Sequence, residues 1–126
     1  MLAVDTNILV RFLTNDDKKQ AELARKAMRD NEIWLSKTVL LETEWVLRYS
    51  YDFDPRQILG GFRALLGLSN LRMEDPAQVT TALNGYAAGL DFADALHVAG
   101  AQPWPFYTFD QKLIKKSAPF AVVRHP

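Results

Sequence analysis

The chain has 126 residues, of which 48% are hydrophobic and 24% are charged. This composition is typical of a folded globular protein and excludes disordered, collagen-like and low-complexity chains. Fifteen basic and fifteen acidic residues cancel, so binding of a polyanion requires local basic patches or bound cations. Because there is no cysteine, disulfides, thiolate nucleophiles and cysteine-bound metals are excluded. We expect residues 1–126 to form a single domain.

The apolar runs of the chain are short. The longest, residues 1–4 and 120–123, fall far below the roughly 18–20 residues that cross a bilayer. Residues 1–10 lack the basic start and the continuous apolar stretch of a secretory signal. We therefore expect no membrane span and a cytoplasmic location.

Short apolar runs alternate with longer segments of helical periodicity, which favours an α/β fold with a mostly parallel sheet. Strands are predicted at residues 1–4, 33–35, 71–73, 106–109 and 121–124. Helices are predicted from about residue 8 to 13 and at residues 16–30, 37–49, 91–101 and 111–117. Two further helices begin at Asp54-Pro55 and Asp75-Pro76, where an acidic N-cap precedes a proline, and the second of them ends at Gly89.

Two acidic residues, Asp5 and Asp110, each follow an apolar run that is predicted to be a strand. Ligands of open α/β sheets bind beyond the carboxyl ends of the strands, so these acids are candidates for a shared site. The alternative for each is a structural role as a helix N-cap.

Glu42 is predicted to lie on a buried helix face, because its neighbours one turn away are Thr38, Val39, Trp45 and Val46. A carboxylate buried there needs a partner or a cation, unless the long side chain reaches solvent. Glu44 has Arg48 four residues later and is interpreted as part of a surface ion pair.

Asp91 and Asp94 share the first turn of the helix at residues 91–101. Asp91 suffices as N-cap, and Asp94 either belongs to a site or interacts with the helix dipole. The helix is rich in small residues, which are Ala93, Ala95, Ala99, Gly100 and Ala101. These small residues indicate close packing, which would place both Asp91 and Asp94 inside the molecule.

These acids can form one pocket of oxygen ligands, made of Asp5, Glu42, Asp94 and Asp110 with Asp91 nearby. Because four like charges repel each other, such a pocket requires protonation or a cation, and oxygen ligands favour Mg²⁺ or Mn²⁺. A metal site of this kind is suited to phosphoryl chemistry, in which the metal activates water and stabilises the leaving oxygen.

Other polar residues have two interpretations each. His97 either contacts the metal ligands or substrate, or is a packed helix histidine. Lys112, Lys115 and Lys116 share one helix face that either flanks a phosphate backbone or is simply solvated, and Arg11 and Lys37 are equally ambiguous. No glycine-rich phosphate loop and no serine–histidine arrangement occurs.

The predicted helices have more apolar surface than one small core needs. The residues concerned either pack in the core or form an interface with a second subunit, and they are Trp45, Tyr49, Phe62 and Leu66.

Four segments resemble the PIN domain family in order and spacing, and more narrowly its VapC-type toxins. They are VDTNIL at residues 4–9, VLLETEWVL at residues 39–47, DFADALH at residues 91–97 and YTFD at residues 107–110. The resemblance extends from residue 1 to about residue 124. It implies an α/β/α sandwich with a mostly parallel central sheet.

The resemblance also implies a Mg²⁺- or Mn²⁺-dependent endoribonuclease, the toxin of a type II toxin–antitoxin pair, with one or two ions. The acids that match the family motifs are Asp5, Glu42, Asp94 and Asp110, with Asp91 as an accessory acid. Thr6, Asn7 and Thr108 match positions that support them. An antitoxin would place an arginine against the carboxylates, and a homodimer is expected by analogy.

Two alternatives remain. One is a PIN-like module that binds RNA or a protein without turnover. The other is a phosphoacceptor receiver domain, although no strand-terminal lysine lies opposite an aspartate pair.

Overall fold

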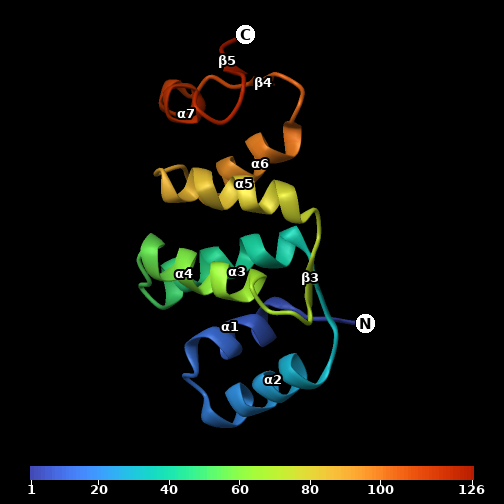
Figure 1. Ribbon diagram of the computed structural model, residues 1–126. Coiled ribbons are helices and arrows are strands. Elements are labelled where there is room, and N and C mark those ends of the chain that lie inside the picture. Colours follow the sequence, from blue (N-terminus) through green and yellow to red (C-terminus); the bar gives the residue numbers. More distant parts are fainter. The chain divides into compact units, whose positions relative to one another are not determined.

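The computed structural model describes all of residues 1–126, which divide into two compact units, residues 1–74 and residues 75–126. Unit 1 contains β1 (Leu2–Ala3), α1 (Thr6–Thr14), α2 (Lys18–Asp30), β2 (Ile33–Leu35), α3 (Lys37–Ser50), α4 (Pro55–Leu66) and β3 (Leu71–Met73). Unit 2 contains α5 (Pro76–Ala87), α6 (Phe92–Ala101), β4 (Phe106–Tyr107), α7 (Gln111–Ser117) and β5 (Val123–Arg124). In Figure 1 unit 1 runs from blue to yellow-green and unit 2 from yellow to red. All the predicted helices and strands are present, and the α/β class is confirmed.

The sheet of unit 1 has three parallel strands in the order β1-β2-β3. Ile33, in the middle strand, is paired with Leu2 on one side and Leu71 on the other. Ile33 and Leu35 are fully buried while Trp34 between them is 38% exposed, as the alternation of side chains along a strand requires. The predicted parallel pairing is confirmed, and it places Asp5 just beyond the end of β1.

The helices of unit 1 pack α1 against α2 and α3, and α4 against α3 and β3. Phe62 is fully buried in this core, but Trp45 is 54% and Tyr49 is 60% exposed, so the interpretation of these two residues as core is wrong. The reason is the rotation of α3, which turns Leu40 and Leu47 inward. At the start of α4, Asp54 forms the predicted cap as part of a full capping box.

Unit 2 contains a two-stranded parallel sheet, β4-β5, and the packed helix pair α5 and α6. A β-carbon at Gly85 of α5 would lie 2.9 Å from Cδ1 of Leu90, so glycine permits the close approach there. Gly89 follows α5 with a φ of +104°, which confirms it as the residue that ends this helix. Asp75 is not the predicted cap of α5, because its backbone is left-handed and its side chain makes no capping hydrogen bond. No helix of the chain has the length and apolar character needed to span a membrane.

Candidate functional site

The end of β1 places Asp5 and Thr6 at the start of α1. Oδ1 of Asp5 accepts a hydrogen bond from the backbone N–H of Thr6 at 2.8 Å, so Asp5 is an N-cap, as the alternative interpretation held. Thr6 is only 5% exposed, and its hydroxyl donates a hydrogen bond to Oε1 of Glu42. Thr6 therefore contacts two of the predicted metal ligands, from different elements, with two different donor groups.

The two glutamates of α3 have the reverse of their predicted burial. Glu42 is exposed, whereas Glu44 is 1% exposed and lies on the inward face of the helix. The ion pair of Glu44 with Arg48 exists, with Arg48 Nε donating to Oε2 at 2.8 Å, but its carboxylate is buried and not on the surface. The prediction of a buried Glu42 is wrong because its neighbour Trp45 is itself exposed. Burial is therefore no argument for a cation at Glu42, and its contact with Thr6 is what keeps it a candidate ligand.

At the start of α6, Asp91 is an exposed N-cap whose Oδ2 accepts the backbone N–H of Asp94 at 3.2 Å. Asp94 is half-buried and its carboxylate makes no hydrogen bond in the structure. The expectation that both acids lie inside is wrong for Asp91, because the buried face of α6 is formed by Phe92, Ala95, Val98 and Ala99.

Asp94 is the acid whose ionisation the structure perturbs. Partial burial raises the pKa of its carboxyl group, and the negative charges of Asp91 and Asp110 raise it further, while His97 acts in the opposite direction. Three predicted ligands of unit 2 therefore interact electrostatically. His97 is exposed, so its interpretation as a packed helix histidine is wrong.

Asp110 follows β4 and is the N-cap of α7, where Oδ1 accepts the backbone N–H groups of Lys112 at 2.9 Å and Leu113 at 3.1 Å. Its own backbone N–H donates to the hydroxyl of Thr108 at 3.1 Å. Thr108 thus fixes the turn that presents Asp110, as a supporting residue would.

The candidate ligands are Asp5 and Glu42 in unit 1 and Asp91, Asp94 and Asp110 in unit 2. Within either unit, no group of three or more histidine, aspartate or glutamate side chains is placed so that it could hold a metal ion. Their chemistry nevertheless fits a hard divalent cation, because every donor is a carboxylate oxygen. A cation would also offset the repulsion that raises the pKa of Asp94.

The lysines predicted as possible contacts of a phosphate backbone differ in their exposure to solvent. Lys112, Lys115 and Lys116 are exposed along α7, and Nζ of Lys116 donates to the carbonyl of Gly89 at 3.4 Å. Lys37 is half-buried at the start of α3, where its backbone N–H donates to Oε1 of Glu74 at 2.9 Å.

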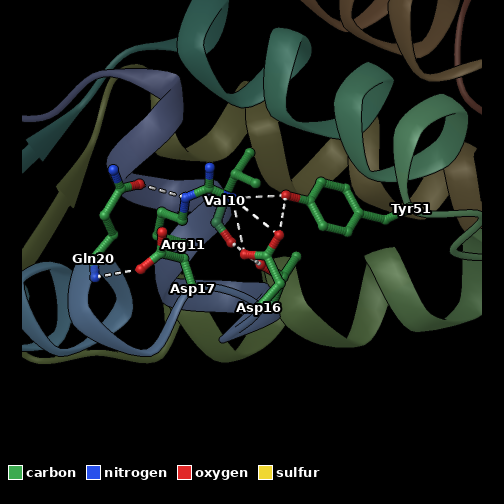
Figure 2. A network of polar contacts seen from close by, with 7 residues as sticks. Val10, Arg11, Asp16, Asp17, Gln20 and Tyr51 are labelled. Atoms are coloured by element: carbon green, nitrogen blue, oxygen red, sulfur yellow. Dashed lines mark hydrogen bonds and ion pairs between the residues drawn. The ribbon is translucent and has the colours of Figure 1, made fainter.

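Arg11 belongs to a network that sequence analysis missed (Figure 2). Its Nη1 donates to both carboxylate oxygens of Asp16, at 2.8 and 3.0 Å, and to the hydroxyl of Tyr51 at 2.8 Å. Its Nε donates to Oε1 of Gln20 at 2.7 Å. No local pattern indicates this, because Tyr51 lies 40 positions from Arg11. Since Asp16 balances its charge, Arg11 is a weaker candidate for a phosphate contact than the exposed lysines of α7.

The family model of the PIN domain matches residues 2–103, which is more than half of the chain. The chain belongs to the PIN domain family. The matched residues include Asp5, Glu42, Asp91 and Asp94, while Asp110 lies beyond them. PIN domains are in general metal-dependent nucleases that bind RNA, which supports a hydrolase. No curated protein matches this PIN domain.

Proposed function

We propose that this PIN domain is an endoribonuclease that uses Mg²⁺ or Mn²⁺ to hydrolyse RNA phosphodiester bonds. The observation that carries the proposal is the position of Thr6, whose backbone binds Asp5 and whose hydroxyl binds Glu42. Hydrogen-bonded partners of this kind orient metal-ligating carboxylates. The two acids are far apart in the sequence, so their common contact is a property of the fold.

The residues that would hold one or two ions are Asp5, Glu42, Asp94 and Asp110, with Asp91 as an accessory acid. A bound Mg²⁺ or Mn²⁺ supplies the charge that activates water and stabilises the leaving oxygen. Thr6 keeps Glu42 in one orientation, and Thr108 keeps the Asp110 turn in place. We assign Asn7 a supporting role beside Asp5.

Positive side chains would hold the RNA backbone. The exposed lysines of α7, at positions 112, 115 and 116, follow Asp110 directly and are the main candidates. Lys37 and Arg11 are weaker ones, since Lys37 is half-buried and the charge of Arg11 is balanced by Asp16.

For the biological role we propose the toxin of a type II toxin–antitoxin pair, of the VapC type, acting in the cytoplasm as a homodimer. The motifs at residues 4–9, 39–47, 91–97 and 107–110 support this assignment. The proposed partner is an antitoxin that places an arginine against the carboxylates in place of the metal.

One observation favours a second function, a module that binds RNA or protein without turnover. Asp5, Asp91 and Asp110 all act as helix N-caps, so each has a structural role that needs no metal.

Cleavage of a pool of structured RNAs distinguishes the two functions. Wild type, Asp94→Asn and Glu22→Gln are incubated with Mg²⁺, with Mn²⁺ and with EDTA, and products are read on a sequencing gel. Glu22 is the matched control, because it is an exposed carboxylate with no hydrogen bond or ion pair in the structure. We expect metal-dependent cleavage by wild type and Glu22→Gln alone. Equal cleavage by Asp94→Asn removes Asp94 from the reaction, and RNA binding without products by all three supports the binding module.

The toxin role has its own test. Expression of the wild type in a bacterial host is expected to arrest growth, and expression of Asp94→Asn is not. Metal-dependent RNA cleavage in vitro combined with normal growth would reject the toxin role and leave the nuclease in place.

A further inference from the structure

A pocket of 370 Å³ lies between α1 and α2 and is lined by Asn7, Ile8, Arg11, Gln20 and Leu23. This volume falls within the range of about 300–1,000 Å³ that is common for small-molecule sites. Asn7 is two residues from Asp5, so the pocket begins beside a proposed metal ligand. Apart from Asn7, the lining residues have no part in the proposed cleavage chemistry.

Two groups of hydrogen-bond donors belong to this lining. Arg11 has only donors, so the oxygen of the Gln20 amide must face Arg11 Nε, at 2.7 Å. The amide nitrogen of Gln20 then keeps its two N–H groups, for which the structure shows no acceptor. Nη2 of Arg11 likewise makes no hydrogen bond, because Arg11 donates only through Nε and Nη1.

The donors are held in place by the network behind them. Figure 2 shows the guanidinium of Arg11 between Gln20 on one side and Asp16 and Tyr51 on the other. The planar guanidinium bound on both sides has little freedom to rotate, so its free edge is preorganised for a ligand. Asp16 balances the charge, and the pocket therefore favours a neutral ligand with acceptor atoms over a free phosphate.

The remaining lining is apolar. Leu23 is 61% exposed, and Ile8 is half-buried. An aliphatic surface next to fixed donors fits a flat ring that has acceptors along one edge. Nucleobases have this form, and guanine offers two adjacent acceptors, O6 and N7, to donors such as those of an arginine.

We propose that the pocket between α1 and α2 binds a nucleobase of the RNA substrate, with guanine preferred, and so contributes to the choice of cleavage site. The inference rests on the proposed function, since RNA is the ligand that supplies nucleobases beside Asp5. Arg11 and Gln20 read the edge of the base, and Leu23 covers its face.

The test measures binding of nucleoside monophosphates in EDTA, where no cleavage occurs. Backbone amide shifts of the ¹⁵N-labelled protein are followed while guanosine, adenosine or 7-deazaguanosine 5′-monophosphate is added. Gln20→Glu keeps an oxygen for Arg11 but replaces the free N–H groups with a second oxygen. Lys19→Gln is the control, because it changes the charge by the same amount at an exposed neighbour that does not line the pocket.

We expect guanosine monophosphate to shift the amides of Ile8, Gln20 and Leu23, and to bind Gln20→Glu about tenfold more weakly than Lys19→Gln. The adenosine and 7-deazaguanosine nucleotides should bind the wild type more weakly than guanosine monophosphate. Equal binding of all three nucleotides, or equal binding by the two variants, would overturn the proposal. So would shifts of the same amides with N-acetyltryptophanamide and none with nucleotides, which would assign the pocket to a protein segment.

The two proposals fail separately. Metal-dependent RNA cleavage without guanine binding rejects the pocket and keeps the nuclease. Guanine binding at these amides without cleavage of any RNA supports base binding by the pocket, but it rejects the nuclease and with it the role of the pocket in the choice of cleavage site.

Discussion

The hydroxyl of Thr6 donates a hydrogen bond to the carboxylate of Glu42, and this contact joins the first residue of α1 to α3. The same residue holds Asp5 through its backbone N–H at 2.8 Å. Because Thr6 is 5% exposed, packing fixes its position and it can orient Glu42. Thr6 is thus a positioning residue for two carboxylates.

Thr6→Val replaces the hydroxyl with a methyl group of similar size and should weaken metal binding about 10–100-fold, as loss of a ligand's supporting hydrogen bond does. The readout is the Mg²⁺ concentration that gives half-maximal RNA cleavage. Thr43→Val is the control, because Thr43 is fully buried and its hydroxyl binds only the carbonyl of Val39. An equal Mg²⁺ requirement for both variants would show that the Thr6 contact is merely structural.

The two glutamates of α3 should respond differently to loss of charge. Glu42→Gln is expected to abolish cleavage with little change in melting temperature, because Glu42 is exposed. Glu44→Gln is expected to destabilise the fold by about 2–3 kcal/mol, below the cost for a fully buried pair because the Arg48 side chain is 33% exposed.

Urea unfolding and RNA cleavage, measured on both variants, check this assignment. Each variant is the other's control, since both remove one carboxylate charge from the same helix. A folded Glu44→Gln that has lost cleavage, beside an active Glu42→Gln, would exchange the two roles.

Much of the fold can be predicted from the sequence because its signals are local. Asp54-Pro55 starts α4 as expected, and residues 33–35 and 71–73 are strands at the predicted positions. These elements depend on capping chemistry and apolar periodicity, which act within a few residues. The acids at the strand ends were found in the same way.

The rotation of α3 could not be predicted, because it depends on which of two apolar faces the rest of unit 1 covers. Trp45 and Val46 made the Glu42 face look buried, yet Leu40 and Leu47 are the residues that face the core. Nor could the Arg11 network be predicted, since Tyr51 is brought to it only by tertiary packing.

The charge of Asp94 should make the stability of the fold depend on pH and on bound metal ions. Burial and the charges of Asp91 and Asp110 raise its pKa in the folded state. The protonated group therefore stabilises the fold, and this contribution is lost as pH rises through the folded-state pKa. Asp94→Asn stays neutral, so at pH 7 without divalent ions it should melt at a higher temperature than the wild type.

Added Mg²⁺ should reverse that order in a thermal melt. At about 100 times its dissociation constant it stabilises the wild type by about 2.7 kcal/mol, and it should leave Asp94→Asn nearly unchanged. Glu22→Gln is expected to behave like the wild type. An equal rise for wild type and Asp94→Asn would place the ion elsewhere.

The hydrogen bonds around Arg11 predict that the variant Tyr51→Phe changes the pH at which the protein unfolds in acid. The hydrogen bond from the Tyr51 hydroxyl, at 2.7 Å, lowers the pKa of Asp16, and donors on Thr14 and Arg11 add to this. A lowered folded-state pKa gives stability that is present above the ordinary carboxyl pKa and is lost as pH falls through the folded value. Tyr51→Phe removes the main donor, so its acid unfolding, followed by circular dichroism, should begin at a higher pH than that of the wild type. Tyr107→Phe is the control, because it removes an exposed hydroxyl that has no hydrogen bond in the structure, and it should unfold like the wild type. Identical acid transitions for the two variants would mean that the Tyr51 hydroxyl does not lower the pKa of Asp16.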